Sequence, residues 1–155
     1  MRAAFDALPD DLAKRLHGLV AEHANHVFTQ TPGLHGFSDE ENQELPPVPQ
    51  TLVRRHAGSG RVGLYLASHA GRIFGMSEDE GEALLQQLIQ HATQRQFVYT
   101  HRWRLHDLVM WDNRCTVHRG KPYDDLRWPR DMQRATVSDV GPTCEQEGVV
   151  VPAAA

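Results

Sequence analysis

Two stretches of the chain have the spacing of apolar residues that is typical of amphipathic helices. The first is residues 8–27, where apolar side chains recur at helical intervals: Leu8, Leu12, Leu16, Leu19 and Val20. The second is residues 78–93, which are preceded by the capping pattern of Ser77 and Glu80. We therefore expect a helix in each stretch.

Short runs of alternating or β-branched residues predict strands between and after these helices. Residues 57–60, Ala-Gly-Ser-Gly, are turn residues between two such runs. The predicted strands are residues 51–55, 61–67, 96–103, 107–111 and 134–138. Residues 29–50 are polar and rich in proline, which predicts a loop with one helical turn at 38–43. The predicted helices and strands do not alternate regularly as in βαβ units. The fold class is therefore α+β, or the β-rich half of a double-sheet barrel decorated with helices.

Composition narrows the class of protein. The chain has 155 residues, 16 Lys and Arg against 20 Asp and Glu, and a net charge of −4. This length fits one domain or part of one, and the acidic balance argues against a nucleic-acid partner. No apolar run approaches the roughly 20 residues of a membrane span. The first ten residues lack a secretory signal, and two cysteines make no disulfide framework, so we expect a cytoplasmic protein. Ten histidines are the unusual feature.

The segment Trp-Asp-Asn-Arg-Cys-Thr-Val-His-Arg-Gly, residues 111–120, is the densest in chemically useful side chains. His118 follows a predicted strand, which suits a metal ligand, and Arg130 and Arg134 stand 12 and 16 residues later. Arginine binds carboxylates with two parallel hydrogen bonds. By pattern alone the same residues also fit a hydrogen-bonded histidine with solvated arginines.

Other candidate pairs leave functional and structural interpretations open. His23 and His26 are spaced for a shared metal ion, but a solvated helix face explains them as well. Cys115 and His118 have a spacing seen in zinc sites and in thiol nucleophiles, yet no further ligand or activating group is evident. The last pair, His56 and His69, fits either a common pocket or exposed turns.

At residues 111–120 the sequence resembles the taurine / 2,4-dichlorophenoxyacetate dioxygenase family. The likeness extends to Arg-Arg-His-Ala-Gly-Ser-Gly-Arg at 54–61, Ser-His-Ala at 68–70, Glu-Gly-Glu-Ala-Leu-Leu at 80–85 and His-Ala-Thr-Gln-Arg-Gln-Phe-Val-Tyr at 91–99. It covers residues 1–138, and the phenoxyacetate-type branch is the most similar. The resemblance implies an Fe(II)- and 2-oxoglutarate-dependent dioxygenase with a double-stranded β-helix (jelly roll) core, of which this chain forms the C-terminal part as an incomplete barrel. Residues 139–155 are then a tail.

The resemblance implies roles for five residues, as follows. His118 is a ligand of the iron, and Arg130 grips the remote carboxylate of 2-oxoglutarate, with one extra residue in the intervening loop. Arg134 faces the substrate anion or the cosubstrate, and His56 and His69 lie on the substrate side. The implied substrate is a small anion, preferably an aryloxyalkanoate. For an aryloxyacetate, hydroxylation beside the ether oxygen gives a hemiacetal that breaks down to a phenol and glyoxylate.

The sequence departs from the family in two places. His106 stands before Asp107 where a glycine is usual, so we expect a turn residue with positive φ to be lost. More importantly, the family takes its other two iron ligands from a His-x-Asp motif, and none of the ten histidines has Asp or Glu two positions later.

The missing motif predicts a chain that is inactive alone. We expect it either to form homo-oligomers or to need a missing N-terminal half. Two alternatives remain from the sequence. One is a taurine or alkylsulfonate dioxygenase, in which Arg134 holds a sulfonate, and the other is a non-catalytic remnant that binds an anion and self-associates.

Overall fold

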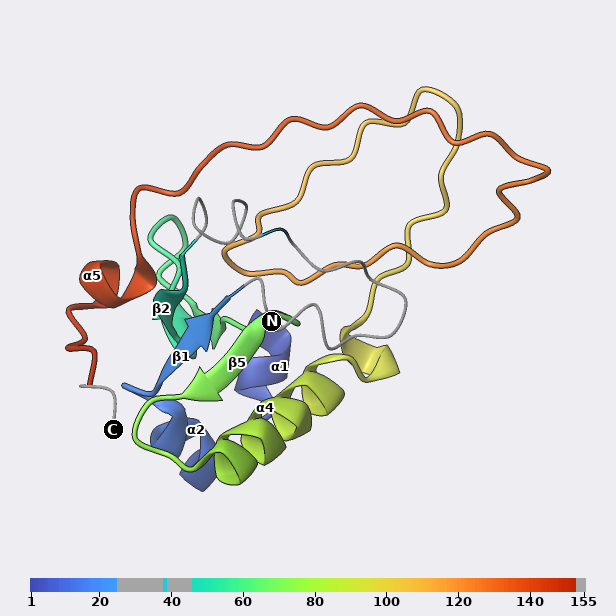
Figure 1. The fold of residues 1–155 in the computed structure, drawn as a ribbon. Helices are drawn as coiled ribbons and strands as arrows, with labels where there is room; N and C mark the ends of the chain where they lie inside the picture. Colours follow the sequence, from blue (N-terminus) through green and yellow to red (C-terminus); the bar gives the residue numbers. More distant parts are fainter. Residues whose placement is uncertain (25–37, 39–45, 153–155) are drawn as a thin grey trace.

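The computed structural model describes residues 1–24, 38 and 46–152. Two small antiparallel sheets and several helices confirm the predicted α+β class. A long segment without helix or strand, residues 98–142, follows the short 3-10 helix after α4, extends away from the sheets and returns to α5 (Figure 1); we call it the extended segment. The elements are α1 Arg2–Asp6, α2 Asp10–Leu16, β1 Val20–His23, β2 Val48–Thr51, β3 Val53–Arg55, β4 Val62–Leu64, β5 Ala70–Ile73, α4 Glu78–Ala92, the 3-10 helix η2 Arg95–Phe97 and α5 Thr143–Glu147.

The first sheet has the strand order β2-β1-β5, and β3 pairs with β4 in a separate hairpin. The hairpin closes through the predicted turn, where the backbone N–H of Gly60 donates to His56 O at 2.8 Å. Gly60 has a φ of 68°, a conformation that glycine adopts without steric cost. Both predicted strands of this hairpin are therefore confirmed, although each is shorter than expected, since β3 begins at Val53 and Thr51 belongs to β2.

Helix α4 confirms the prediction from the 78–93 pattern. Ser77 and Glu80 form a reciprocal capping box, and Leu84, Leu85 and Leu88 are buried in the core. A Cβ at Gly81 would lie 3.3 Å from the backbone N of Ile73, so this glycine lets the helix pack closely on β5.

The helix predicted over 8–27 is confirmed only as the shorter α2, and its continuation as a helix through residues 20–23 is wrong. The chain turns at Gly18, whose φ is 80°, and residues 25–27 lie outside the described part of the chain. Val20 and Ala21 follow as consecutive buried residues of β1. A central strand that is covered on both faces has such a run of buried residues. Here the run happens to continue the helical spacing of the apolar residues before it, so the pattern alone predicts the strand as part of the helix.

The strands predicted at 96–103, 107–111 and 134–138 are also wrong in the described structure. Residues 95–97 form η2, and the other residues of these stretches have no regular structure. A strand forms only where a neighbouring strand accepts its hydrogen bonds, and the described residues offer these stretches no such neighbour.

Two further expectations are corrected near these segments. The predicted loop 29–50 contains the start of β2, an edge strand, which is where a proline such as Pro49 is tolerated. The turn expected at 38–43 lies outside the described residues, apart from Ser38. A positive φ is retained before Asp107, since His106 itself has a φ of 68°.

The last described residues pack against the first sheet. The backbone N–H of Thr51 donates to Thr143 Oγ1 at 2.7 Å, and Thr143 N donates to Gln50 Oε1 at 2.9 Å. Arg54, in β3, reaches Asp139 at 3.0 Å and Gln146 at 2.7 Å. Helix α5 therefore covers the outer edge of β2. Among the described residues, no helix has the length and apolar character needed to cross a membrane.

Candidate functional site

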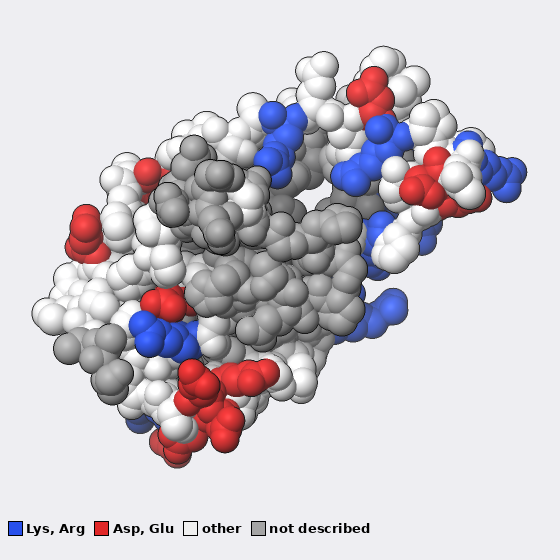
Figure 2. All heavy atoms as spheres, viewed as in Figure 1, with Lys and Arg blue, Asp and Glu red and all other residues white. Residues whose placement is uncertain are grey.

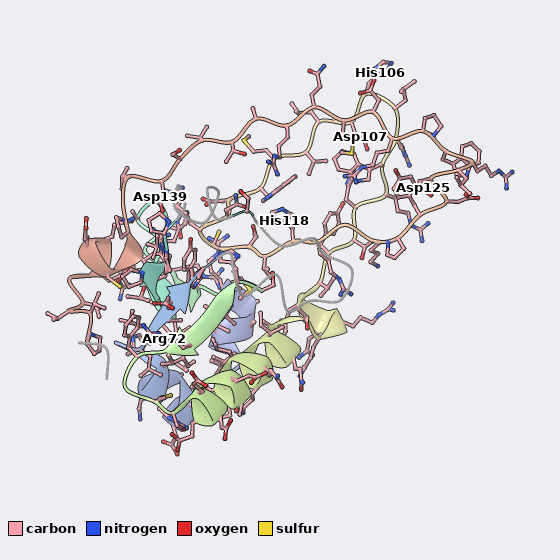
Figure 3. The ribbon with its side chains drawn as sticks, viewed as in Figure 1. Arg72, His106, Asp107, His118, Asp125 and Asp139 are labelled. Atoms are coloured by element: carbon pink, nitrogen blue, oxygen red, sulfur yellow. The ribbon has the colours of Figure 1, made fainter. Side chains whose placement is uncertain are left out.

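The stretch 111–118 forms a compact loop that ends at His118. The rings of Trp111 and His118 lie 4.7 Å apart, centroid to centroid. Between them, Asp112 O accepts hydrogen bonds from Cys115 N at 3.2 Å and from Thr116 Oγ1 at 2.7 Å. Figure 3 shows His118 between the sheets and the far end of the extended segment, which carries Asp125. The imidazole of His118 is exposed, so it is accessible to a ligand.

The carboxylate of Asp112 is the most heavily hydrogen-bonded group near His118. Arg114 donates to it from Nε at 2.9 Å, from Nη2 at 2.8 Å and from its backbone N at 2.9 Å. His56 Nε2 lies 2.9 Å from Oδ2 of the same carboxylate. The guanidinium of Arg114, followed by the hydrogen bond from His56, holds the pKa of Asp112 well below its usual range against the opposing effect of burial.

The two downstream arginines lie on the exposed part of the extended segment. Arg130 Nε is 2.8 Å from Met132 Sδ, and the side chains of Arg130 and Arg134 are both exposed. Residues 95–134 contain nine Lys and Arg against five Asp and no Glu, a net charge of +4 in a chain whose total is −4. Lys and Arg accordingly gather at the end of the molecule formed by this segment, and Asp and Glu dominate the opposite end (Figure 2). This charge distribution suits an anionic ligand.

The two histidines expected on the substrate side have different surroundings. His56 contacts Asp112, whereas His69 packs edge-on against His23 with ring centroids 4.9 Å apart. His23 also stacks on Tyr65 at 5.7 Å. The described residues therefore place His56 and His69 in separate clusters.

His23, which the sequence analysis considered only as part of a helical metal pair, lies on strand β1 instead. Its side chain is buried, and among the described residues no partner meets its Nε2. Burial, reinforced by the neighbouring His69, lowers the pKa of His23 to about 4. Alternation within β1 was the available signal, but the helical interpretation of 8–27 concealed it. The metal pair considered for His23 and His26 stays a prediction, because His26 lies outside the described residues.

The described residues do not by themselves fit a three-ligand iron site. His118 is one candidate ligand, and no histidine of the sequence has an acid two positions later. A different trio, His56, Asp112 and Cys115, brings ligand atoms within 4.8 Å of one another. However, the Asp112 carboxylate in that trio is already occupied by Arg114 and His56. The alternative of a Cys115 nucleophile with His118 as its base stays a prediction, and the burial of Cys115 gives it no support.

An exposed histidine and two exposed arginines on one segment offer a possible metal ligand and two groups that bind small anions. The sequence model described as "Taurine catabolism dioxygenase TauD, TfdA family" matches residues 1–136. The chain belongs to this family, which confirms the resemblance seen in its motifs.

Three relatives define the relationship. The "Alpha-ketoglutarate-dependent 2,4-dichlorophenoxyacetate dioxygenase" of Cupriavidus pinatubonensis (strain JMP 134) is 50% identical over 139 residues, which cover 90% of this chain and 48% of that protein. The "(S)-phenoxypropionate/alpha-ketoglutarate-dioxygenase" of Sphingobium herbicidovorans is 41% identical, covering 80% of this chain and 45% of that protein. A crystal structure of AAD-2 in complex with Mn(II) and N-oxalylglycine matches with a TM-score of 0.84 and 52% identity, covering 92% of this chain and 56% of that one. The chain thus spans about half the length of these relatives.

Proposed function

We propose that this chain forms part of an Fe(II)- and 2-oxoglutarate-dependent dioxygenase that hydroxylates a small anionic substrate, with an aryloxyalkanoate favoured. The observation that carries the proposal is the family match over residues 1–136, which includes the loop ending at His118. The names of the 2,4-dichlorophenoxyacetate and phenoxypropionate relatives support the substrate class. In this proposal the chain is part of a double-stranded β-helix, one domain over residues 1–138 followed by 139–155.

The proposed roles follow from residue chemistry. His118 supplies one imidazole ligand to the iron, which with 2-oxoglutarate would provide the oxidising chemistry. Arg130 holds the remote carboxylate of 2-oxoglutarate with paired hydrogen bonds. Arg134 binds the substrate anion or the cosubstrate, and His69 lies on the substrate side. The same resemblance assigns His56 to the substrate side, although the His56 ring faces Asp112.

The remaining two iron ligands come from outside this chain's sequence in our proposal. Large apolar side chains of the extended segment support such a partner, since Leu105, Leu108 and Leu126 are each at least 87% exposed. Exposed apolar surface of this kind marks an interface. Either a second copy of the chain or an N-terminal half carrying His-x-Asp would supply these ligands. No oxidation step is assigned to this chain alone.

Turnover by the chain joined to an N-terminal half with His-x-Asp tests the proposal. We expect 2-oxoglutarate consumption coupled to an aryloxyacetate, and loss of at least about tenfold in kcat/KM for 2-oxoglutarate in Arg130→Gln. Arg127→Gln, on the same exposed segment, is the matched control and should retain activity. Coupling to taurine in place of the aryloxyacetate would favour the alkylsulfonate alternative.

A non-catalytic anion-binding remnant is the second candidate. The absence of an acid two positions after any histidine favours it. Metal content after reconstitution separates the two, because the dioxygenase should retain one iron per site and the remnant should retain none.

A further inference from the structure

The long segment between α4 and α5 has very little anchorage in the rest of the protein. Residues 93–142 are all described, and Cys115 is the one buried residue among them. Among the described residues, a single hydrogen bond joins residues 99–138 to the chain before them, and it is the bond between His56 and Asp112. Two adjacent points therefore fix the middle of the segment, the Cys115 side chain and this bond.

The ring of His56 is oriented for this bond by the hairpin turn. His56 follows β3 directly, and the backbone N–H of Ser59 donates to His56 Nδ1 at 3.2 Å. An accepting Nδ1 places the ring proton on Nε2, which then donates to Asp112 Oδ2 at 2.9 Å. The side chain of His56 is 14% exposed. Both ring nitrogens are thus used within the protein, which leaves no ring nitrogen free to bind substrate.

Asp112 transmits this anchorage to the loop that follows. Its side chain accepts from the backbone N–H of Arg114 at 2.9 Å, and its carbonyl accepts from Cys115 N and Thr116 Oγ1. These bonds define the turn that leads to His118, whose ring packs on Trp111 immediately before Asp112. The position of His118 relative to β3 therefore depends on the His56–Asp112 bond.

We propose that His56 is a positioning residue: through Asp112 it fastens the loop that presents His118 to the end of β3. The importance of this for iron binding rests on the proposed function, whereas the fastening itself is a property of this chain. The proposal assigns His56 a different task from the substrate contact that the family resemblance implies.

Amide hydrogen exchange of the whole chain, measured by NMR, tests the fastening. The backbone N–H groups of Arg114 and Cys115 donate hydrogen bonds to Asp112. In His56→Ala we expect their exchange to accelerate about tenfold. His56→Gln should restore protection, because its amide nitrogen reaches the place of Nε2. The matched control is His101→Ala, which removes a histidine–aspartate pair of the same 2.9 Å length within the extended segment, to Asp107. It should accelerate exchange at Arg104 and leave Arg114 unchanged.

The position of His118 provides a second readout that a general loss of stability would not mimic. Its ring protons lie against Trp111, so their chemical shifts report the packing. In His56→Ala these shifts should move towards those of a free histidine, and in His56→Gln and His101→Ala they should stay. Unchanged exchange and shifts in His56→Ala, or failure of glutamine to restore them, would overturn the proposal. Failure of iron to bind a chain joined to an N-terminal half would instead count against the proposed function and leave these measurements intact.

Discussion

Replacing Asp139 by asparagine should destabilise the protein by about 2 kcal/mol, because it leaves a buried arginine without its counter-charge. The side chain of Arg54 is 4% exposed, and its Nη1 lies 3.0 Å from Asp139 Oδ2. Loss of one member of a fully buried pair costs about 3–5 kcal/mol. Asp139 is 28% exposed, so water compensates part of this cost, and Gln146 and the Tyr65 ring still contact the guanidinium.

Urea denaturation followed by circular dichroism measures the loss. With a slope of about 1–3 kcal/mol per molar urea, the midpoint should fall by about 1 M. The control is Asp6→Asn, which removes an ion pair to Arg61 whose two side chains are more than half exposed; its cost should stay below about 1 kcal/mol. Equal losses in the two variants would refute the reasoning that burial of Arg54 determines the effect.

The pH dependence gives the same pair a second test. Burial raises the pKa of Asp139, but the backbone N–H of Val140 and the Arg54 guanidinium outweigh it, and the net pKa lies below 3.8. A carboxyl with a lowered pKa contributes stability above 3.8 that is lost as the pH falls through its folded value. The stability difference between the protein and Asp139→Asn should therefore shrink below pH 4.

Three further substitutions test separate features. The pKa of His23 is lowered to about 4, so between pH 6.5 and 4 this histidine is protonated in the unfolded chain and neutral in the folded one. The free energy of unfolding should therefore fall by roughly 2–4 kcal/mol over that range. A His23→Gln variant whose urea midpoint falls equally over the same range would contradict this. His106→Gly should stabilise the protein by about 0.5–1 kcal/mol in urea denaturation, because glycine adopts the φ of 68° at lower cost; a loss of stability would argue against strain there. Ser77→Ala should lower the stability by about 1 kcal/mol through loss of the α4 cap, whereas Ser68→Ala, outside any cap, should show no comparable change in thermal midpoint.

The elements that the sequence predicted well are those whose signals are local. The capping pair of Ser77 and Glu80 and the stripe that includes Leu88 determine α4 within sixteen residues. The glycine turn before β4 likewise determines its own hairpin. The prediction of one continuous helix over residues 8–27 failed because the same apolar spacing also fits a short helix followed by a central strand. The turn at Gly18 decides between these two structures.

The functional residues show the same division between local and long-range information. The motif around His118 identified the family and its candidate ligands without placing them in space. The bond from His56 to Asp112 joins residues 56 positions apart, and the contact between His23 and His69 joins β1 to the start of β5. Neither follows from spacing along the chain, because tertiary pairing of strands creates both. The predicted strands beyond residue 96 stay without ladder partners for the same reason.

Absorption spectroscopy without oxygen is the most direct test of the proposed division of the iron site. Fe(II) and 2-oxoglutarate would be added to the purified chain, and to the chain joined to an N-terminal half that carries His-x-Asp. We expect the visible charge-transfer band of the iron–2-oxoglutarate chelate only in the joined protein, and its loss in His118→Ala of that protein. A band of equal strength from the chain alone as a monomer, or from the His118→Ala variant, would contradict the account.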